Sequence, residues 1–156
     1  MSATIAEADK APAFKLATEA GEFLTLASLK GKKIVLYFYP EDDTSGCTKE
    51  AIAFSGLRKE FDSAGAVILG VSPDSVESHD KFSKKYKLDL TLLSDETKEM
   101  LEAYGVWVEK SMYGKKYMGI ERTTFLIDST GKIAAIWPKV KVDGHAAEVL
   151  AAAQKL

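Results

Sequence analysis

Residues 34–50 read IVLYFYPEDDTSGCTKE. The first six, Ile34–Tyr39, form a continuous β-branched and aromatic run, which predicts a strand covered on both faces. Pro40 ends this strand, because proline has no backbone N–H to donate to a neighbouring strand. Apolar residues then recur at helical spacing, so we expect a helix that begins near Cys47 and runs to about residue 64. The sequence therefore places a thiol where a buried strand ends and a helix begins.

The rest of the chain alternates short apolar segments with amphipathic ones. A leading β-hairpin is expected over residues 14–26, around the break Thr18-Glu19-Ala20-Gly21. Further strands are expected at 66–71, 90–93, 106–108, 123–127 and 132–137, helices at 75–86, 95–104 and 144–155, and a surface loop at 109–120. The turn sequence Asp128–Gly131 makes the last two strands antiparallel. This order predicts a mixed central β-sheet flanked by helices, a thioredoxin-like α/β fold.

Composition and charge favour one globular domain over residues 1–156. Hydrophobic residues make up 46% of the chain, enough for a sizeable core. The 21 basic and 23 acidic residues give a net charge of -2, which offers no basic field for nucleic acid or an anionic membrane. No apolar run approaches the roughly 20 residues of a membrane span, and residues 1–10 lack a signal peptide. We expect a cytoplasmic protein with a flexible N-terminus over residues 1–10.

The chain has one cysteine, Cys47, and two histidines, His79 and His145. One cysteine cannot form an internal disulfide, and three such residues cannot supply the Cys/His cluster of a structural zinc site. We therefore expect no metal and no other cofactor. His79 lies on the polar side of an expected helix and His145 at the start of the last one, so we expect both side chains to be solvated.

The position of Cys47 favours chemical reactivity. Helix N-terminal amides stabilise a thiolate, the nucleophilic form of cysteine, and open α/β sheets bind ligands where parallel strands end. The alternative is a buried cysteine that acts as a small apolar side chain. The loop-forming residues Asp42–Gly46 weigh against this alternative, but position alone leaves both interpretations open.

The spacing Pro40-x-x-x-Thr44-x-x-Cys47 is the active-site pattern of the peroxiredoxins, and from about Ala11 to Leu156 the chain resembles their bacterioferritin-comigratory (PrxQ) branch. The resemblance implies a thioredoxin-dependent peroxidase, an oxidoreductase that reduces hydrogen peroxide and organic hydroperoxides through a cysteine thiolate, without metal or haem. The resemblance also rests on further segments, which follow one another in the order found in the family: Tyr37–Pro40, Gly46–Ala51, Gly70–Ser75, Leu93–Asp95, Tyr104–Val106 and Arg122–Asp128.

The resemblance also implies roles for single residues. Cys47 would attack the peroxide and become a sulfenic acid, while Arg122 supplies a fork of donors to thiolate and peroxide. The Thr44 hydroxyl would accept from the peroxide or donate to the thiolate, and Pro40 would cover the site and limit water. Without the resemblance, Arg122 reads as an exposed strand-end charge, Thr44 as a turn residue and Pro40 as a strand terminator.

Two supporting residues complete the expected site. The Gly46 and Cys47 amides would cradle an anion at the helix start. Glu50 resembles the family residue that orients the arginine, and its alternative role is an acid in the first turn of a helix, favoured by the dipole.

The sequence departs from the family pattern in its cysteines. A second, resolving cysteine often stands five residues after the first, where this chain has Ile52, or in a Phe-Cys step that Phe82-Ser83 replaces. Ser45 also replaces a common proline, from which we expect only a change in loop stiffness. We expect a one-cysteine cycle completed by an external thiol, such as thioredoxin, glutaredoxin or glutathione, or by a second subunit.

Two other functions remain open at this stage. A peroxide sensor or thiol-relay protein would pass the Cys47 oxidation to a partner as a mixed disulfide. An inert thioredoxin-like binding module would form no sulfenic acid. Members of the resembled branch are often monomers, so a monomer is expected.

Overall fold

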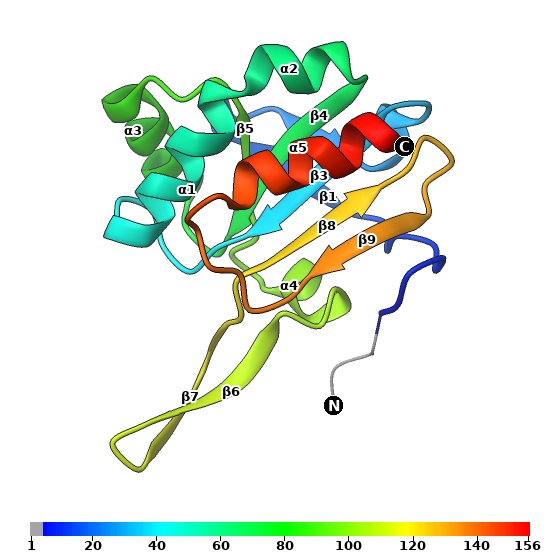
Figure 1. Ribbon diagram of the computed structural model, residues 1–156. Coiled ribbons are helices and arrows are strands. Elements are labelled where there is room, and N and C mark those ends of the chain that lie inside the picture. Colours follow the sequence, from blue (N-terminus) through cyan, green and yellow to red (C-terminus); the bar gives the residue numbers. More distant parts are fainter. Residues whose placement is uncertain (1–4) are drawn as a thin grey trace.

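The computed structural model describes residues 5–156, built around a seven-stranded sheet with the strand order β2-β1-β5-β4-β3-β8-β9 (Figure 1). The strands are β1 Lys15–Thr18, β2 Phe23–Thr25, β3 Lys33–Phe38, β4 Ala66–Ser72, β5 Thr91–Ser94, β8 Thr123–Ile127 and β9 Ile133–Trp137. Neighbours among β3, β4 and β5 are parallel, and the other neighbouring pairs are antiparallel. The expected mixed sheet and the leading β1–β2 hairpin are confirmed.

Five α-helices and one short 3₁₀ helix are found in this part of the chain. They are η1 Ala27–Leu29, α1 Ser45–Gly56, α2 Arg58–Ser63, α3 Val76–Tyr86, α4 Glu99–Ala103 and α5 His145–Lys155. None of the described helices is both long and apolar enough to span a membrane.

Strand β3 forms the centre of the core, because its side chains alternate between two buried clusters. Val35 and Tyr37 face the cluster formed with α1, α2, α3 and α5, whereas Leu36 and Phe38 face the cluster formed with α4 and the N-terminal segment. Burial on both faces explains why the sequence of this strand is continuously apolar. The chain leaves β3 into α1, so the start of α1 is anchored by the core itself.

The helix expected from Cys47 to about residue 64 is in fact two helices, and the expectation is wrong at Leu57. This residue has φ -104° and ψ 12°, and its N–H bonds back to Phe54 and Ser55. The preceding Gly56 is exposed and favours the helix weakly. The break turns α2 so that Phe61 packs 6.0 Å from Phe54, ring centre to ring centre. Helix α4 is likewise shorter than the expected 95–104.

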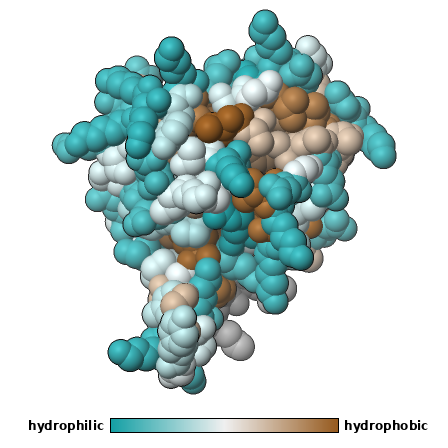
Figure 2. All heavy atoms as spheres, turned by 60° about the vertical axis from the view of Figure 1, so that its left-hand side comes forward, coloured by the Kyte–Doolittle hydropathy of each residue, from teal (hydrophilic) through white to brown (hydrophobic). Residues whose placement is uncertain are grey.

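The surface loop expected at 109–120 is also wrong, because this segment forms an antiparallel hairpin of β6 Trp107–Met112 and β7 Lys115–Ile120. Tyr113 (φ 53°) and Gly114 (φ 78°) form a two-residue turn with positive φ at both positions, which suits the twist of a hairpin. Figures 1 and 2 show it as a narrow projection from the body. Solvent on both sides removes the apolar alternation by which sequence reveals a strand.

Part of the N-terminal stretch of residues 1–10, which is expected to be flexible, makes backbone hydrogen bonds to the β8–β9 region. The Ala8 N–H donates to the Ile133 carbonyl at 2.8 Å, and the Ala11 N–H donates to Gly131 at 2.9 Å. The segment therefore lies along the β8–β9 turn. Residues 1–4 lie outside the described part of the chain.

Gly70→Ala should destabilise the fold. A Cβ at Gly70 would lie 2.7 Å from the Tyr37 ring and 3.0 Å from Leu92, and Tyr37 cannot move away because it is fully buried and stacks 4.8 Å from Phe54. We expect urea denaturation to show a loss of about 1–3 kcal/mol. The control is Gly56→Ala, where a Cβ meets open space and stability should stay constant or rise by up to about 1 kcal/mol. Equal effects of the two changes would contradict the packing argument.

Candidate active site

Cys47 lies in the first turn of α1, directly after the turn that leaves β3. Thr44 is the N-cap residue with an extended backbone (φ -91°, ψ 158°), and the first intrahelical bond runs from Thr48 N–H to its carbonyl. The N–H groups of the preceding turn thus lack helical acceptors and form the positive end of the helix dipole. The cysteine is only 1% exposed. A buried thiol therefore lies at the electropositive end of a helix.

Arg122 meets this thiol from the far end of the chain. It immediately precedes β8, and the antiparallel register places Thr123 opposite Phe38, at the end of β3. Its Nη2 donates to Cys47 Sγ at 3.3 Å, and its Nη1 donates to Glu50 Oε1 at 2.6 Å. The side chain is 18% exposed, so the guanidinium does not lie free at a strand end.

Glu50 is the buried counter-charge of Arg122. Glu50 is 1% exposed, and its Oε2 has no hydrogen-bond partner among the described residues. Burial raises the pKa of Glu50 to about 7, against the lowering effect of Arg122. Burial alone would lower the pKa of the Arg122 guanidinium, but the Glu50 carboxylate and the Cys47 sulfur outweigh it, and the net direction is upward. Glu50 is thus not a solvated acid at a helix start.

The other expected residues lie in the same turn. The Thr44 hydroxyl donates to the Glu41 carbonyl at 3.0 Å, which leaves its oxygen lone pairs to accept a further hydrogen bond. Gly46 lies against the arginine, since a Cβ there would be 3.4 Å from Arg122 Nη2. Pro40 is exposed just beyond β3.

The expectation that both histidines are solvated is wrong. His145 is 4% exposed and its Nε2 pairs with Thr124 Oγ1 at 2.8 Å, and burial lowers the pKa of His145. His79 is fully buried and lies 2.7 Å from Asp42. The sequence does contain an indication that His79 is buried: it stands three residues before Phe82, so the two side chains lie on the same face of α3, and both are buried.

A buried thiol at the start of the helix after a central strand, held by an arginine, defines a cysteine-dependent redox protein of the thioredoxin-like fold. The sequence profile of the AhpC/TSA family matches residues 8–136, and the chain belongs to this family. It is a peroxiredoxin, a thiol-dependent peroxidase, similar to the Bcp/PrxQ proteins.

Three relatives illustrate the likeness. Peroxiredoxin Bcp of Bacillus subtilis is 50% identical over 147 residues, which are 94% of each chain. The structure of the Xanthomonas campestris bacterioferritin comigratory protein matches with a TM-score of 0.88 and 48% identity, over 91% of this chain and 90% of that one. A yeast mitochondrial 1-Cys peroxiredoxin matches with a TM-score of 0.80 and 26% identity, over 94% and 74%. The family resemblance and the fold are thereby confirmed.

Glu50→Gln should change how stability depends on pH. The Glu50 pKa rises from 4.5 to about 7 on folding, so between these values the folded protein binds a proton that the unfolded chain has released. This contribution to stability is fully present below pH 4.5 and is lost as the pH rises through 7. We expect the free energy of unfolding of the wild type, minus that of the variant, to fall across this window in urea titrations. A constant difference would contradict the raised pKa.

Proposed function

We propose that Cys47 is the peroxidatic cysteine and that Arg122 is its electrostatic partner. The observation that supports this is the 3.3 Å contact between Arg122 Nη2 and Cys47 Sγ in a buried site. The thiolate lone pair attacks one peroxide oxygen, an S–O bond forms, and the O–O bond breaks. The second oxygen leaves as hydroxide or alkoxide and takes up a proton. Sulfur is oxidised to sulfenic acid and the peroxide is reduced to water or an alcohol.

The surrounding groups suit a reaction in which negative charge moves from sulfur to oxygen. The guanidinium faces sulfur with one nitrogen and Glu50 with the other, so Glu50 fixes the orientation of the donors before peroxide arrives. The Thr44 oxygen accepts from the peroxide O–H. Gly46 leaves space for the arginine, and Pro40 adds no backbone donor at the edge of the site. These roles are inferred from position and chemistry.

Hydrogen peroxide and organic hydroperoxides are the proposed substrates. The step needs only an O–O bond whose distal oxygen reaches the sulfur, so the rest of the molecule is free to vary. The Xanthomonas campestris relative is described by its alkyl peroxide reduction activity, which supports the organic class.

We infer that an external thiol completes the cycle. Cys47 is the only cysteine, and the positions where relatives carry a resolving cysteine hold Ile52 and Ser83. The external thiol condenses with the sulfenic acid, releasing water and forming a mixed disulfide, and a second thiol displaces Cys47 from it. The yeast 1-Cys relative is described as resolved via glutathione and thioredoxin systems, which supports glutathione, glutaredoxin or thioredoxin as reductant.

We propose further that the protein acts as a cytoplasmic monomer. One chain supplies the thiol, the arginine and the carboxylate, so the reaction needs no residue from a second copy. A cycle that depends on external thiols suits a compartment that keeps thiols reduced.

Arg122→Ala should slow the reaction of Cys47 with hydrogen peroxide by roughly 10²–10³-fold, the cost typical of losing one preorganised donor. Stopped-flow loss of the thiol measures this rate, and circular dichroism checks the fold. Arg122→Lys keeps the charge without the fork of donors and should give an intermediate rate. The control Arg58→Ala removes an exposed arginine on α2 that pairs with Asp62 and Asp89, and its rate should equal that of the wild type. An unchanged rate in Arg122→Ala would place the arginine outside the reaction.

One equivalent of peroxide should add one oxygen atom to the mass of the protein, and Cys47→Ser should abolish this gain. Glutathione added afterwards should give a one-to-one mixed disulfide, which excess thiol then reverses. Intact-protein mass spectrometry follows each step. A covalent dimer as the main product would instead indicate that a second subunit resolves the sulfenic acid.

A further inference from the structure

The β6–β7 hairpin projects from the body of the protein next to the active site, and the proposed mechanism does not use it (Figure 1). Its second strand ends at Ile120, and Arg122 follows two residues later, a span of at most about 7 Å. The Glu121 N–H donates to the Val106 carbonyl at 2.9 Å, which holds the two ends of the hairpin together. Arg122 itself contacts the Cys47 sulfur. A molecule bound at the base of the hairpin therefore lies close to the arginine that holds the thiol.

The hairpin concentrates exposed apolar and aromatic side chains. Seven large side chains of this kind are exposed in the described part of the chain, and four of them belong to the hairpin: Met112, Tyr113, Tyr117 and Met118. None of these four belongs to either core cluster. Tyrosine and methionine are enriched in contacts between proteins, where their side chains adapt to a partner. The composition of the hairpin therefore indicates a contact surface.

One face of the hairpin combines two lysines with a methionine and a tyrosine. Successive residues of a strand point to opposite faces, and the register places Lys110 opposite Tyr117 and Met112 opposite Lys115. A Cβ at Gly119 would lie 3.3 Å from Lys110 and 3.4 Å from Tyr117, so these two side chains lie over the glycine on the same side. Lys110, Met112, Lys115 and Tyr117 together form the basic face.

The opposite face of the hairpin has balanced charge. Glu109 stands opposite Met118 there, and Lys116 Nζ lies 3.6 Å from Glu109 Oε1 in an exposed ion pair. On the basic face, Lys110 donates to the Ile120 carbonyl, an uncharged acceptor, and keeps its full positive charge. Three lysines and one glutamate give the hairpin a net charge of +2, in a chain whose net charge is -2. The positive charge of the hairpin is thus concentrated on the basic face.

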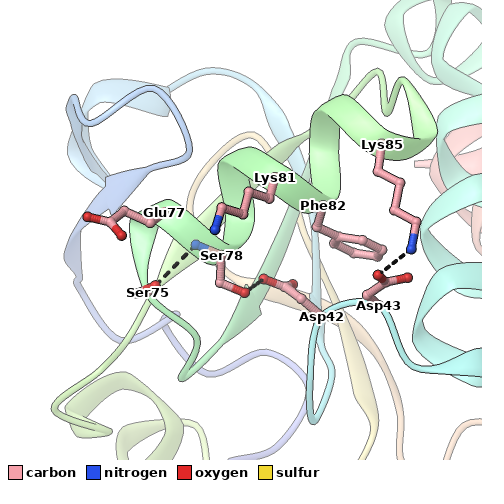
Figure 3. Close-up of a pocket in the computed structure, with 8 residues that line it drawn as sticks. All are labelled: Asp42, Asp43, Ser75, Glu77, Ser78, Lys81, Phe82 and Lys85. Carbon is pink, nitrogen blue, oxygen red and sulfur yellow. Dashed lines mark hydrogen bonds and ion pairs between the residues drawn. The ribbon is translucent and has the colours of Figure 1, made fainter.

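The surface between α3 and the turn of residues 40–44, which leads from β3 to Cys47, has mixed charge instead. Figure 3 shows a cavity of about 360 Å³ there, lined by three carboxylates, two lysines and three further side chains: Asp42, Asp43, Glu77, Lys81, Lys85, Ser75, Ser78 and Phe82. Lys85 pairs with Asp43 at 2.7 Å. This lining carries more negative than positive charge, so it disfavours an acidic partner, which the basic face attracts.

We propose that the basic face is the docking surface for a protein thiol that reduces oxidised Cys47, and that this partner carries acidic and apolar side chains around its reactive cysteine. The inference rests on the proposed function of Cys47. The lysines attract an acidic surface and guide its approach, while Met112 and Tyr117 supply apolar contact. Transient redox complexes bury small surfaces, below about 1,200 Å², and a hairpin of two short strands offers a surface of this kind.

A second copy of this chain fits the basic face poorly. In a two-fold symmetric contact the same surface meets itself, so Lys110 and Lys115 would face the equivalent lysines of the other copy. Like charges placed opposite one another disfavour such a complex. The charge pattern therefore favours a different, acidic protein.

Two double variants test the proposal, because consecutive residues of β7 lie on opposite faces. Lys115→Gln/Tyr117→Ala removes one lysine and one side chain that is 44% exposed from the basic face. The control, Lys116→Gln/Met118→Ala, removes one lysine and one side chain that is 48% exposed from the opposite face. With an acidic thioredoxin as reductant, we expect the first variant to raise KM roughly 10-fold at constant kcat, and the control to stay within about twofold of the wild type. Equal effects of the two variants would overturn the proposal.

Two reactions with small molecules separate docking from damage to the site. Oxidation of Cys47 by hydrogen peroxide and its reduction by glutathione need no docking surface, so both rates should stay within about twofold of the wild type in both double variants. A loss with glutathione as large as the loss with thioredoxin would contradict a docking role. Added salt should raise the KM of the wild type for thioredoxin, and less steeply that of Lys115→Gln/Tyr117→Ala. Equal salt dependence in the two proteins would also count against the basic face.

The remaining outcomes distinguish failure of the docking proposal from failure of the proposed function. If Cys47→Ser retained peroxide reduction, the proposed function would fail. If glutathione reduced the oxidised wild type but thioredoxin did not, only the docking proposal would fail. It would fail as well if size-exclusion chromatography showed a wild-type dimer that Lys115→Gln/Tyr117→Ala separates, because the basic face would then bind a second copy.

Discussion

The contact between Arg122 and the Cys47 sulfur depends on how β8 pairs with β3. Thr123 lies opposite Phe38, so the residue before β8 meets the chain just as it leaves β3 for α1. A shift of one residue would turn every side chain of β8 to the opposite face. All five residues of β8 are buried, so core packing holds the register. The geometry of the site is thus a consequence of the hydrophobic core, although no residue of β8 itself contacts the sulfur through a hydrogen bond that the structure shows.

Two buried polar pairs hold the chain around the active-site turn. The Arg122–Glu50 ion pair joins the start of β8 to α1, and the Asp42–His79 contact joins the turn of residues 40–44 to α3. Each pair costs desolvation, and removal of one partner leaves an unpaired polar or charged group in the interior. The pairs therefore add little to net stability compared with apolar contacts. Their effect is to fix the relative position of the two segments they join, because a buried polar group away from water finds its hydrogen-bond partner in only one arrangement. Of these residues, Arg122 contacts the sulfur directly, with its Nη2 3.3 Å from Cys47 Sγ, so the position of the guanidinium sets the geometry around the thiol.

Sequence reasoning predicted the parts of this molecule that repeat a local pattern. The buried strand Ile34–Tyr39 is recognisable from its own apolar residues. The spacing of Pro40, Thr44 and Cys47 led to the family resemblance, and the resemblance included Arg122 in the expected site. The projecting β6–β7 hairpin was missed, since solvent on both sides leaves no apolar period. The burial of His79 was missed because its partner, Asp42, lies in a loop 37 residues away in the sequence. A polar residue on a helix is expected to face solvent unless such a partner is known.

A single cysteine has to serve two reactions with different geometric demands. Peroxide is small and reacts with a sulfur that is buried beside Arg122, whereas a protein thiol must touch the sulfur to form a disulfide. The start of α1 suits this conflict, because Thr44 gives no side-chain cap bond and no acidic residue lies in the first turn. Such a helix start opens at lower cost than the core behind it. In the proposed cycle, the balance between oxidation and reduction therefore depends more on the few polar contacts around residues 40–50 than on the stability of the sheet.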